Sequence, residues 1–565
     1  MRTDVDSDSA RTQIRSWFEE CKKHSSCSSS PRESPLPTRV IEVSPPGQDH
    51  PRVFESNGAR GVYATLSYAR GKKAFPTLTT SNYAKFTNGL DMDALAPTIR
   101  DAISTARTLS IPYLWIDAFC ILQDVEEDKL KEISRMNDIY GRSALTIVAA
   151  SAESVYDGLL HPRVHNEPLH TIPVRLGSGK FGSMSINELD AATYDELFEP
   201  ISKRAWAVQE QVMGNRVLTF TTKTMIWRCN EGSKNFDNSL FFPHYLGFGY
   251  NKFDEKYSLN LFSLPISEDE ACANKDKALS CWLRLVSSYS LGTTSLENDK
   301  LNALAGVASR PSFSRALGPG YYAGMWQYEF ARQLTWFTSR SHRTLAEDEA
   351  FHFYRPENYR APSWSWASVD GGKVNFDFYY DEEDEEPRNV LCDILECSTL
   401  PAHPELNPFG EVSSAQLRLQ GPARLAWFNP ITSNVFILPE FTSLASTALE
   451  MGDSVITFEE ALQKHTDEFV KAYPDEDIAE DPELLDGTYF RNVEGICDET
   501  GLREPVLVLS VGITLAKGLD DGVRGLLLMK RGKNHGGGIF KRIGVFERGK
   551  TTDFENEEKV KVSII

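Results

Sequence analysis

The sequence predicts an α/β protein whose first half holds a parallel β-sheet with crossover helices. Strand-like and helix-like patterns alternate between residues 38 and 150, which is typical of βαβ units. The run IPYLWIDAFCIL at 111–122 is almost wholly apolar, as expected for a strand covered on both faces. Later in the chain, runs such as PVLVLSVGI and RGLLLMKRG indicate a β-rich C-terminal region.

The elements of the first half follow in order. TRVIEV at 38–43 and GVYATLSYARG at 61–71 are predicted strands. Residues 98–109 form a predicted helix, because their apolar residues recur at helical spacing. After the apolar run, a helix is expected at 126–140 and a strand at 144–150.

The next elements complete this first region. SKRAWAVQEQVMG at 202–214 is a predicted helix that Gly214 ends. NRVLTFTTKTMIWRC then forms two strands around a turn near Thr222. Before the sheet, a short helical piece around Trp17 leads into a Ser/Pro-rich linker.

The rest of the chain is predicted to contain a mostly helical part followed by a part with strands and acidic loops. Residues 275–345 are predicted to be mostly helical, and APSWSWASVDGG at 361–372 to be an aromatic-rich strand and turn. The acidic stretches at 381–386 and 474–486 are predicted exposed loops. KNHGGGIF at 533–540 lies between strand-like runs, which favours a hairpin turn over a phosphate-binding loop.

Length indicates more than one unit. The 565 residues exceed the roughly 250–300 at which a single core stops growing. The predicted division is an N-terminal helical piece and linker at 1–36, the parallel-sheet domain at 37–230, a helical, aromatic-rich extension at 231–375 and a β-rich region with acidic loops at 376–565.

Composition bears on partners and compartment. With 60 Lys and Arg against 80 Asp and Glu, the formal net charge is −20, so we expect no nucleic-acid partner. The start lacks an apolar signal region, and the apolar stretches are shorter than the roughly 18–20 residues of a membrane span. Nine scattered cysteines indicate reduced thiols in a cytosolic or nuclear compartment, and we expect a cytoplasmic protein.

One cysteine-rich segment has the spacing of a partial metal site. Cys21, His24 and Cys27 follow a C-x2-H-x2-C pattern, but zinc requires four ligands and only three are local. We therefore predict no metal site. The sequence also has no P-loop, no G-x-S-x-G and no H-E-x-x-H, which disfavours a serine hydrolase or a zincin.

Several blocks, in order, resemble the fungal heterokaryon incompatibility (HET) domain. They are YATLSYARG, YLWIDAFCILQD, the segment from EEDKLKEISRMNDIY to ALTIVAA, and KRAWAVQE. The resemblance covers about residues 37–375, with a weaker similarity at FKRIGVFE near the C-terminus. Two positions depart from the family pattern: Ala69-Arg70 stands where the family has Cys-Trp, and Lys129 where a Trp often follows the acidic helix start.

The resemblance implies a TIR-like arrangement of the sheet and a role in non-self recognition with regulated cell death. It implies self-association, or contact with another incompatibility protein, as the switch. Some TIR domains hydrolyse NAD through one glutamate, and on that analogy Glu210 is the catalytic candidate. No cofactor is expected, and NAD would be a substrate. The alternative is a signalling or scaffolding module that acts by contact alone; nothing in the sequence supports an accessory role in secondary metabolism.

Further ligand-binding candidates come from strand ends and from the Glu210 helix. Asp117 follows a strand where open parallel sheets place ligand residues, although it can equally cap the next helix. Ser67 and Tyr68 end a neighbouring strand and either bind ligand or satisfy backbone groups. Arg204 is a candidate for a phosphate or an ordinary paired side chain, and Trp206 is a candidate for stacking or for the core.

Overall fold

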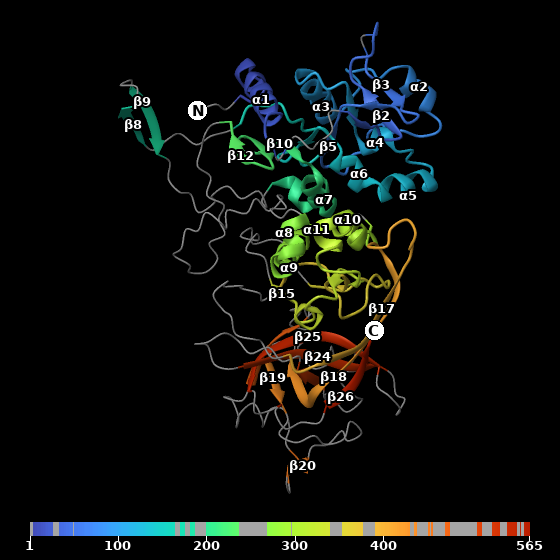
Figure 1. Ribbon diagram of the computed structural model, residues 1–565, viewed down its shortest axis with the longest axis vertical. Coiled ribbons are helices and arrows are strands. Elements are labelled where there is room, and N and C mark those ends of the chain that lie inside the picture. The colour runs from blue at the N-terminus through green and yellow to red at the C-terminus, as the bar shows by residue number, and fades with distance from the viewer. Residues whose placement is uncertain are drawn as a thin grey trace. The chain divides into compact units, whose positions relative to one another are not determined.

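The computed structural model forms two compact units, Met1–Pro265 and Ile266–Ile565 (Figure 1). The structure describes residues 4–25, 27, 33–48, 50–163, 170–175, 181–186, 199–236, 268–294, 296–339, 353–376, 390–429, 434–437, 450–451, 454–455, 469–474, 506–510, 522–531, 539–550, 554 and 559–565. The acidic stretches at 381–386 and 475–486, and most of KNHGGGIF, lie outside these ranges.

The main sheet of the first unit has a parallel centre and antiparallel edges. Its strand order is β12-β11-β10-β7-β5-β6-β2-β3. The four strands β10, β7, β5 and β6 run parallel, whereas β2 joins β6, and β11 joins β10, in antiparallel register. The bounds are β2 (Arg39–Glu42), β3 (Arg52–Glu55), β5 (Tyr63–Ser67), β6 (Tyr113–Trp115), β7 (Leu145–Val148), β10 (Arg216–Phe220), β11 (Met225–Cys229) and β12 (Gly232–Asn235).

Burial explains why the central strands have mainly apolar sequences. Every residue of β5 and β7 is buried, because a parallel sheet is covered on both faces. Helix α3 packs on β6, and α7 packs on both β5 and β7. The helices of this unit are α1 (Asp8–Cys21), α2 (Tyr83–Asn88), α3 (Pro97–Thr108), α4 (Asp117–Cys120), α5 (Glu126–Ser134), α6 (Met136–Gly141), η2 (Pro200–Lys203) and α7 (Ala205–Met213).

Two short pairs of strands stand outside the main sheet. β1 (Ser34–Pro35) pairs with β4 (Arg60–Gly61), and β8 (His170–Arg175) pairs with β9 (Phe181–Ile186). Both pairs are antiparallel. They are separate two-stranded sheets and add no strand to the main sheet.

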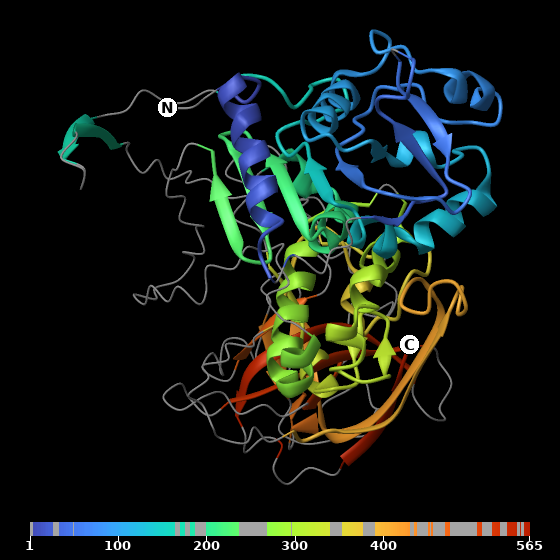
Figure 2. The ribbon, with the colours of Figure 1, turned by 45° about the horizontal axis from the view of Figure 1, so that its top comes forward.

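Helix α1 is the predicted helical piece around Trp17. Ser7 caps its first turn by accepting a hydrogen bond from the Ala10 backbone N–H. Its buried side chains recur at helical spacing, and they are Ala10, Ile14, Trp17, Phe18 and Cys21. This apolar face packs on β11, and Figure 2 shows the dark-blue helix lying across the green strands at the sheet edge.

The structure corrects two predicted elements of this unit. The apolar run at 111–122 is a strand only to Trp115, and the short helix α4 follows it from Asp117. The predicted helix at 126–140 is two helices that meet at Arg135, whose φ of −100° and ψ of 2° leave the helical region. Apolar periodicity misses the first of these, since it does not distinguish a short buried strand from a buried helical turn.

The second unit joins a helical, aromatic-rich part to a β-sheet. Its helices are α8 (Glu268–Ala273), α9 (Lys275–Tyr289), α10 (Asp299–Ala308), α11 (Pro311–Ser314), α12 (Phe330–Gln333) and η4 (Trp366–Ser368). Trp282, Trp326, Trp336, Trp364 and Trp366 are fully buried there. The predicted strand at 361–372 is wrong: its centre is the single turn η4, in which Ser365 caps the Ala367 backbone N–H.

Long strands build the sheet of this unit. β18 connects much of this sheet, because it pairs along its length with β17, β19, β23 and β26. The larger strands are β17 (Asp393–Pro401), β18 (Val412–Asn429), β19 (Asn434–Ile437), β22 (Phe469–Pro474), β23 (Val506–Ser510), β24 (Gly522–Arg531), β25 (Ile539–Lys550) and β26 (Lys559–Ile564). The shorter ones are β13 (Tyr321–Tyr322), β14 (Met325–Trp326), β15 (Phe337–Ser339), β16 (Lys373–Asn375), β20 (Glu450–Met451) and β21 (Ser454–Val455).

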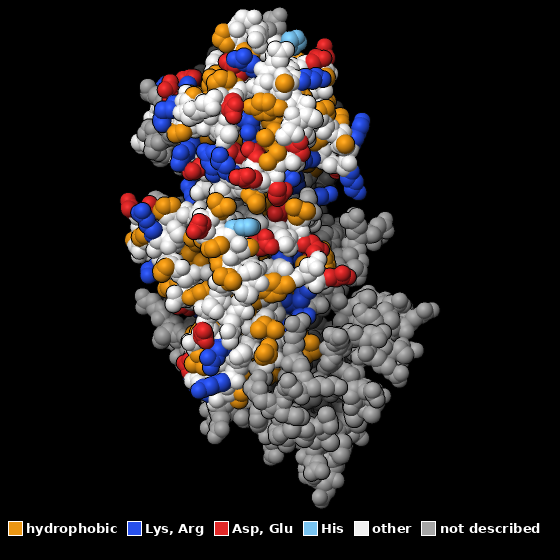
Figure 3. All heavy atoms as spheres, turned by 90° about the vertical axis from the view of Figure 1, so that its right-hand side faces the viewer, with side chains coloured by type: hydrophobic (Ala, Val, Ile, Leu, Met, Phe, Trp, Pro, Cys, Tyr) orange, Lys and Arg blue, Asp and Glu red, His pale blue; other side chains and the backbone are white. Residues whose placement is uncertain are grey.

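The surface of the described residues carries charges of both signs. On the face drawn in Figure 3, Lys and Arg side chains lie among Asp and Glu side chains, as is typical of a solvated surface. No helix within the described ranges is long and apolar enough to cross a bilayer.

Candidate functional site

The candidate site lies at the carboxyl ends of the parallel strands of the first unit. The chain visits these strands in the order β5, β6, β7, β10, yet β6 and β7 flank β5 on opposite sides. The direction of winding therefore reverses at β5, and such a switch point is where open α/β sheets bind ligands. Ser67 is the last residue of β5, and Asp117 follows β6 by two residues.

Glu210 reaches this point from the crossover helix α7. A buried apolar cluster fixes the helix to the sheet, and its members are Val148, Ala150, Ile201, Ala207 and Val217. Gly214 ends α7 at a φ of −67°, so it is not a left-handed cap. A side chain at Gly214 would meet the Thr146 hydroxyl at 2.6 Å, which explains the glycine by close packing of α7 on β7.

Ser67 and Glu210 are in direct contact. The Ser67 hydroxyl donates a hydrogen bond to the Glu210 carboxylate, and both side chains are buried, Glu210 with 5% of its surface exposed. Burial raises the pKa of Glu210, while the Arg204 charge and the Ser67 hydrogen bond act in the opposite direction. The result is a carboxyl group that holds its proton more strongly than an ordinary glutamate.

The surroundings of Asp117, unlike those of Glu210, favour the ionised carboxylate. Its carboxylate accepts hydrogen bonds from the Tyr68 hydroxyl at 3.1 Å, the Arg70 guanidinium at 2.6 Å and the Ala118 backbone N–H at 2.7 Å. Burial opposes its ionisation, but the charges of Arg70 and Arg204 outweigh burial and leave the pKa of Asp117 below its usual value. Asp117 is the first residue of α4, and its carboxylate binds both the backbone N–H of the second residue and side chains at the end of β5.

Arg204 and Trp206 lie at the start of α7. Arg204 is the residue before the helix, and its guanidinium donates to the Tyr68 carbonyl, so it ties α7 to the end of β5. Trp206 and Glu210 are four residues apart on α7 and share a helix face. The binding of a ligand by Arg204, Trp206 or Tyr68 remains a prediction.

Two further residues belong to this cluster and were not predicted as site residues. Arg70 is half-exposed and pairs with Asp117; the sequence marks it only as a departure from the family pattern. Tyr140 of α6 is fully buried, donates to the Leu66 carbonyl at 3.1 Å, and has a pKa raised by burial and then by the negative charge of Glu210. Its place on the apolar stripe of 126–140 indicated burial alone.

Comparison with known proteins places this cluster in a recognised domain. Residues 63–210 match the family model described as Heterokaryon incompatibility protein (HET). The match begins at the first residue of β5 and ends at Glu210. Residues 63–210 therefore form a HET domain.

The match covers less than half of the 565-residue chain. No curated protein and no solved structure matches the chain. The predicted α/β class with a β-rich C-terminal region is confirmed, and the HET domain indicates a heterokaryon-incompatibility-type function.

Proposed function

We propose that the HET domain hydrolyses NAD at the carboxyl end of β5, and that NAD loss leads to cell death in a non-self response. The observation that carries the proposal is the buried hydrogen bond between Ser67 and Glu210 at the carboxyl end of β5, where the winding of the sheet reverses. Shifted pKa values are common among the titratable groups of functional sites, and here the pKa of Glu210 is raised while that of Asp117 is lowered.

The reaction breaks the bond between the ribose carbon C1′ and the nicotinamide nitrogen. The bonding electron pair moves to the ring nitrogen and neutralises the pyridinium, so nicotinamide leaves uncharged. Water adds to the oxocarbenium-like C1′ and releases one proton, which gives ADP-ribose. Ionised Glu210 stabilises the positive charge on the ribose or orients its hydroxyl groups, because a carboxylate in a dry site interacts strongly with developing charge.

The remaining residues supply binding and positioning. Arg70 is exposed on 40% of its side chain and Asp117 on 24%, so this pair faces solvent while Glu210 lies deeper. The Arg70 guanidinium is suited to the pyrophosphate of NAD by bidentate hydrogen bonds. Ser67 holds the Glu210 carboxylate in place by its hydrogen bond.

The direct test is NAD turnover by the purified full-length chain. Loss of NAD with equal amounts of nicotinamide and ADP-ribose supports the enzyme. A chain that impairs growth in cells without turning over NAD supports the alternative, in which the HET domain signals by self-association or by contact with another incompatibility protein.

The pH dependence of hydrolysis should report Glu210. Since only the ionised form stabilises the ribose cation, kcat/KM should fall on the acid side with a midpoint above 4.5, the ordinary value for glutamate. Ser67→Ala removes a hydrogen bond that favours the ionised form, so the midpoint should move to higher pH. Thr65→Val is the control, because the Thr65 hydroxyl contacts Thr146 instead of Glu210. An unchanged midpoint in Ser67→Ala contradicts this role.

Arg70 should affect substrate binding more than chemistry. We expect Arg70→Ala to raise KM for NAD about tenfold with little change in kcat, because one charge-assisted hydrogen bond is worth about 1.5–3 kcal/mol. Steady-state kinetics of the purified chain measure both constants. Arg142→Ala is the control, since Arg142 forms an exposed pair with Asp138. A lower KM in Arg70→Ala would mean that Arg70 occupies the site in place of substrate.

A further inference from the structure

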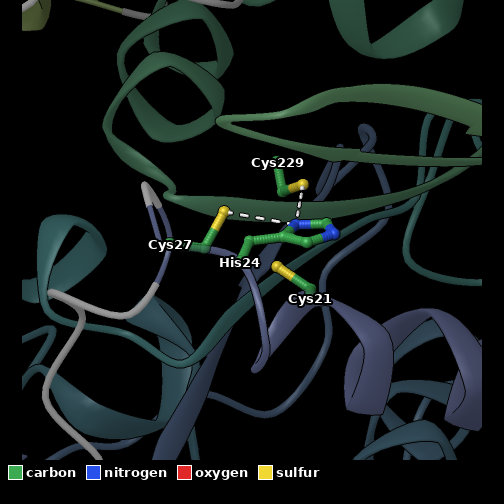
Figure 4. A group of neighbouring side chains, drawn as sticks. All are labelled: Cys21, His24, Cys27 and Cys229. Atoms are coloured by element: carbon green, nitrogen blue, oxygen red, sulfur yellow. Dashed lines mark hydrogen bonds between the residues drawn. The ribbon is translucent and has the colours of Figure 1, made fainter.

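Four metal-binding side chains meet at the edge of the first unit. Cys21 is the last residue of α1, His24 and Cys27 follow it in the next turn, and Cys229 is the last residue of β11. Their ligand atoms all lie within 4.8 Å of one another. Figure 4 shows the three thiols arranged around the His24 ring, with Cys27 and Cys229 directed at Nδ1.

The separations agree with the edges of a tetrahedral zinc site. Zinc bonds of about 2.3 Å to sulfur and 2.0–2.1 Å to nitrogen place neighbouring ligand atoms about 3.5–3.8 Å apart. His24 Nδ1 lies 3.7 Å from Cys27 Sγ and 3.6 Å from Cys229 Sγ. These distances fit two ligands of one ion.

The surroundings suit a charged metal centre. The Arg216 guanidinium donates to Cys21 Sγ at 3.1 Å and to the Cys27 carbonyl at 2.8 Å. Three thiolates and one Zn²⁺ carry a net charge of −1, which buried Arg216 balances. Such hydrogen bonds to ligating sulfur are typical outer-shell contacts of metal sites.

The cluster is enclosed on one side and accessible on another. Cys21 and Cys27 are buried, and the rings of Trp17 and Phe18 pack beside Trp227, with centroids 6.4 Å and 6.2 Å away. A cavity of about 110 Å³ is lined by the other two ligands, His24 and Cys229, together with Trp17 and Trp227. An ion can therefore reach His24 and Cys229 from this cavity.

We propose that Cys21, His24, Cys27 and Cys229 bind one Zn²⁺ in a closed structural site. Three thiolates and one imidazole form a Cys₃His set, for which tetrahedral zinc is the usual ion. The ion joins α1 to β11 across a long stretch of sequence, and closing so long a loop makes metal binding part of the folding free energy. None of the four residues lies within the HET match at 63–210, and the site is independent of the proposed NAD hydrolysis.

Metal analysis of the purified full-length chain tests the proposal. Prepared under reducing conditions, the wild type should hold about one zinc per chain. Cys229→Ser and His24→Ala should lower this content severalfold. Cys272→Ser is the matched control, because Cys272 is an exposed cysteine of the second unit and should leave the zinc content unchanged. Wild-type levels of zinc in the Cys229 variant overturn the assignment.

A second measurement on the wild type does not depend on whether the variants fold. Replacement of the bound metal by Co²⁺ should give the intense visible absorption of tetrahedral cobalt–thiolate coordination. Removal of the metal by a chelator should expose Cys21, Cys27 and Cys229 to a thiol-alkylating reagent, as peptide mapping would show. A disulfide between any two of the three in the reduced preparation, or labelling that is equally fast before and after chelation, overturns the zinc site.

Discussion

Replacing Glu210 by glutamine should reduce NAD hydrolysis about 10²–10³-fold, with most of the loss in kcat. The change removes the negative charge opposite the developing ribose cation, and the loss of one preorganised electrostatic group in an active site typically costs this much. Glutamine has nearly the same shape, and its amide oxygen can still accept the hydrogen bond of Ser67. In cells that express matched protein levels, NAD should fall with the wild type and stay normal with Glu210→Gln.

The control for this experiment is Glu132→Gln. Glu132 is a fully buried glutamate of the same unit, and its carboxylate accepts from the Thr38 hydroxyl at 2.5 Å, away from the candidate site. Its replacement should leave NAD turnover intact. Full NAD turnover by Glu210→Gln would show that Glu210 has no catalytic role. Growth impairment without NAD loss would favour signalling by contact.

Replacing Asp370 by asparagine should destabilise the second unit by about 3–5 kcal/mol, as is usual when a buried ion pair loses one partner. Asp370 pairs with Lys300 of α10 and with Arg360 at 2.6 Å, and both cationic side chains are almost fully buried. Burial lowers the pKa of Lys300 to about 8 even though Asp370 raises it. Without the carboxylate, two desolvated cations would face each other, and unfolding of the full-length chain should begin at lower temperature and lower urea.

The effect should depend on pH in a defined direction. Burial opposes ionisation of Asp370, but Lys300 and Arg360 outweigh it and hold its pKa below 3.8. A carboxylate with a depressed folded pKa contributes its full stability above the unfolded value and loses it as pH falls through the folded pKa. The difference in the free energy of unfolding between the wild type and Asp370→Asn should therefore become smaller below about pH 3.8. Asp393→Asn, which alters an exposed pair with Lys559, should cause no measurable change; an equal loss in both variants would contradict the argument.

Much of the first unit could be predicted from periodicity. The helices at 97–108 and 205–213 and the hairpin of β10 and β11 agree with the apolar spacing and the turn near Thr222. The errors fall where local pattern is ambiguous. The strand before Asp117 ends early, and η4 replaces a predicted strand, because buried aromatic residues occur in both kinds of structure.

The sequence by itself determined the HET domain, the candidates at its strand ends and the C-x2-H-x2-C pattern, because these depend on residue type and short spacing. Only the tertiary structure decided which side chains meet. It joined Ser67 to Glu210, paired Arg70 with Asp117, and brought Cys229 to Cys21, His24 and Cys27. Such contacts arise from strand order and helix packing, and they bring together residues far apart in the chain, where local spacing carries no information.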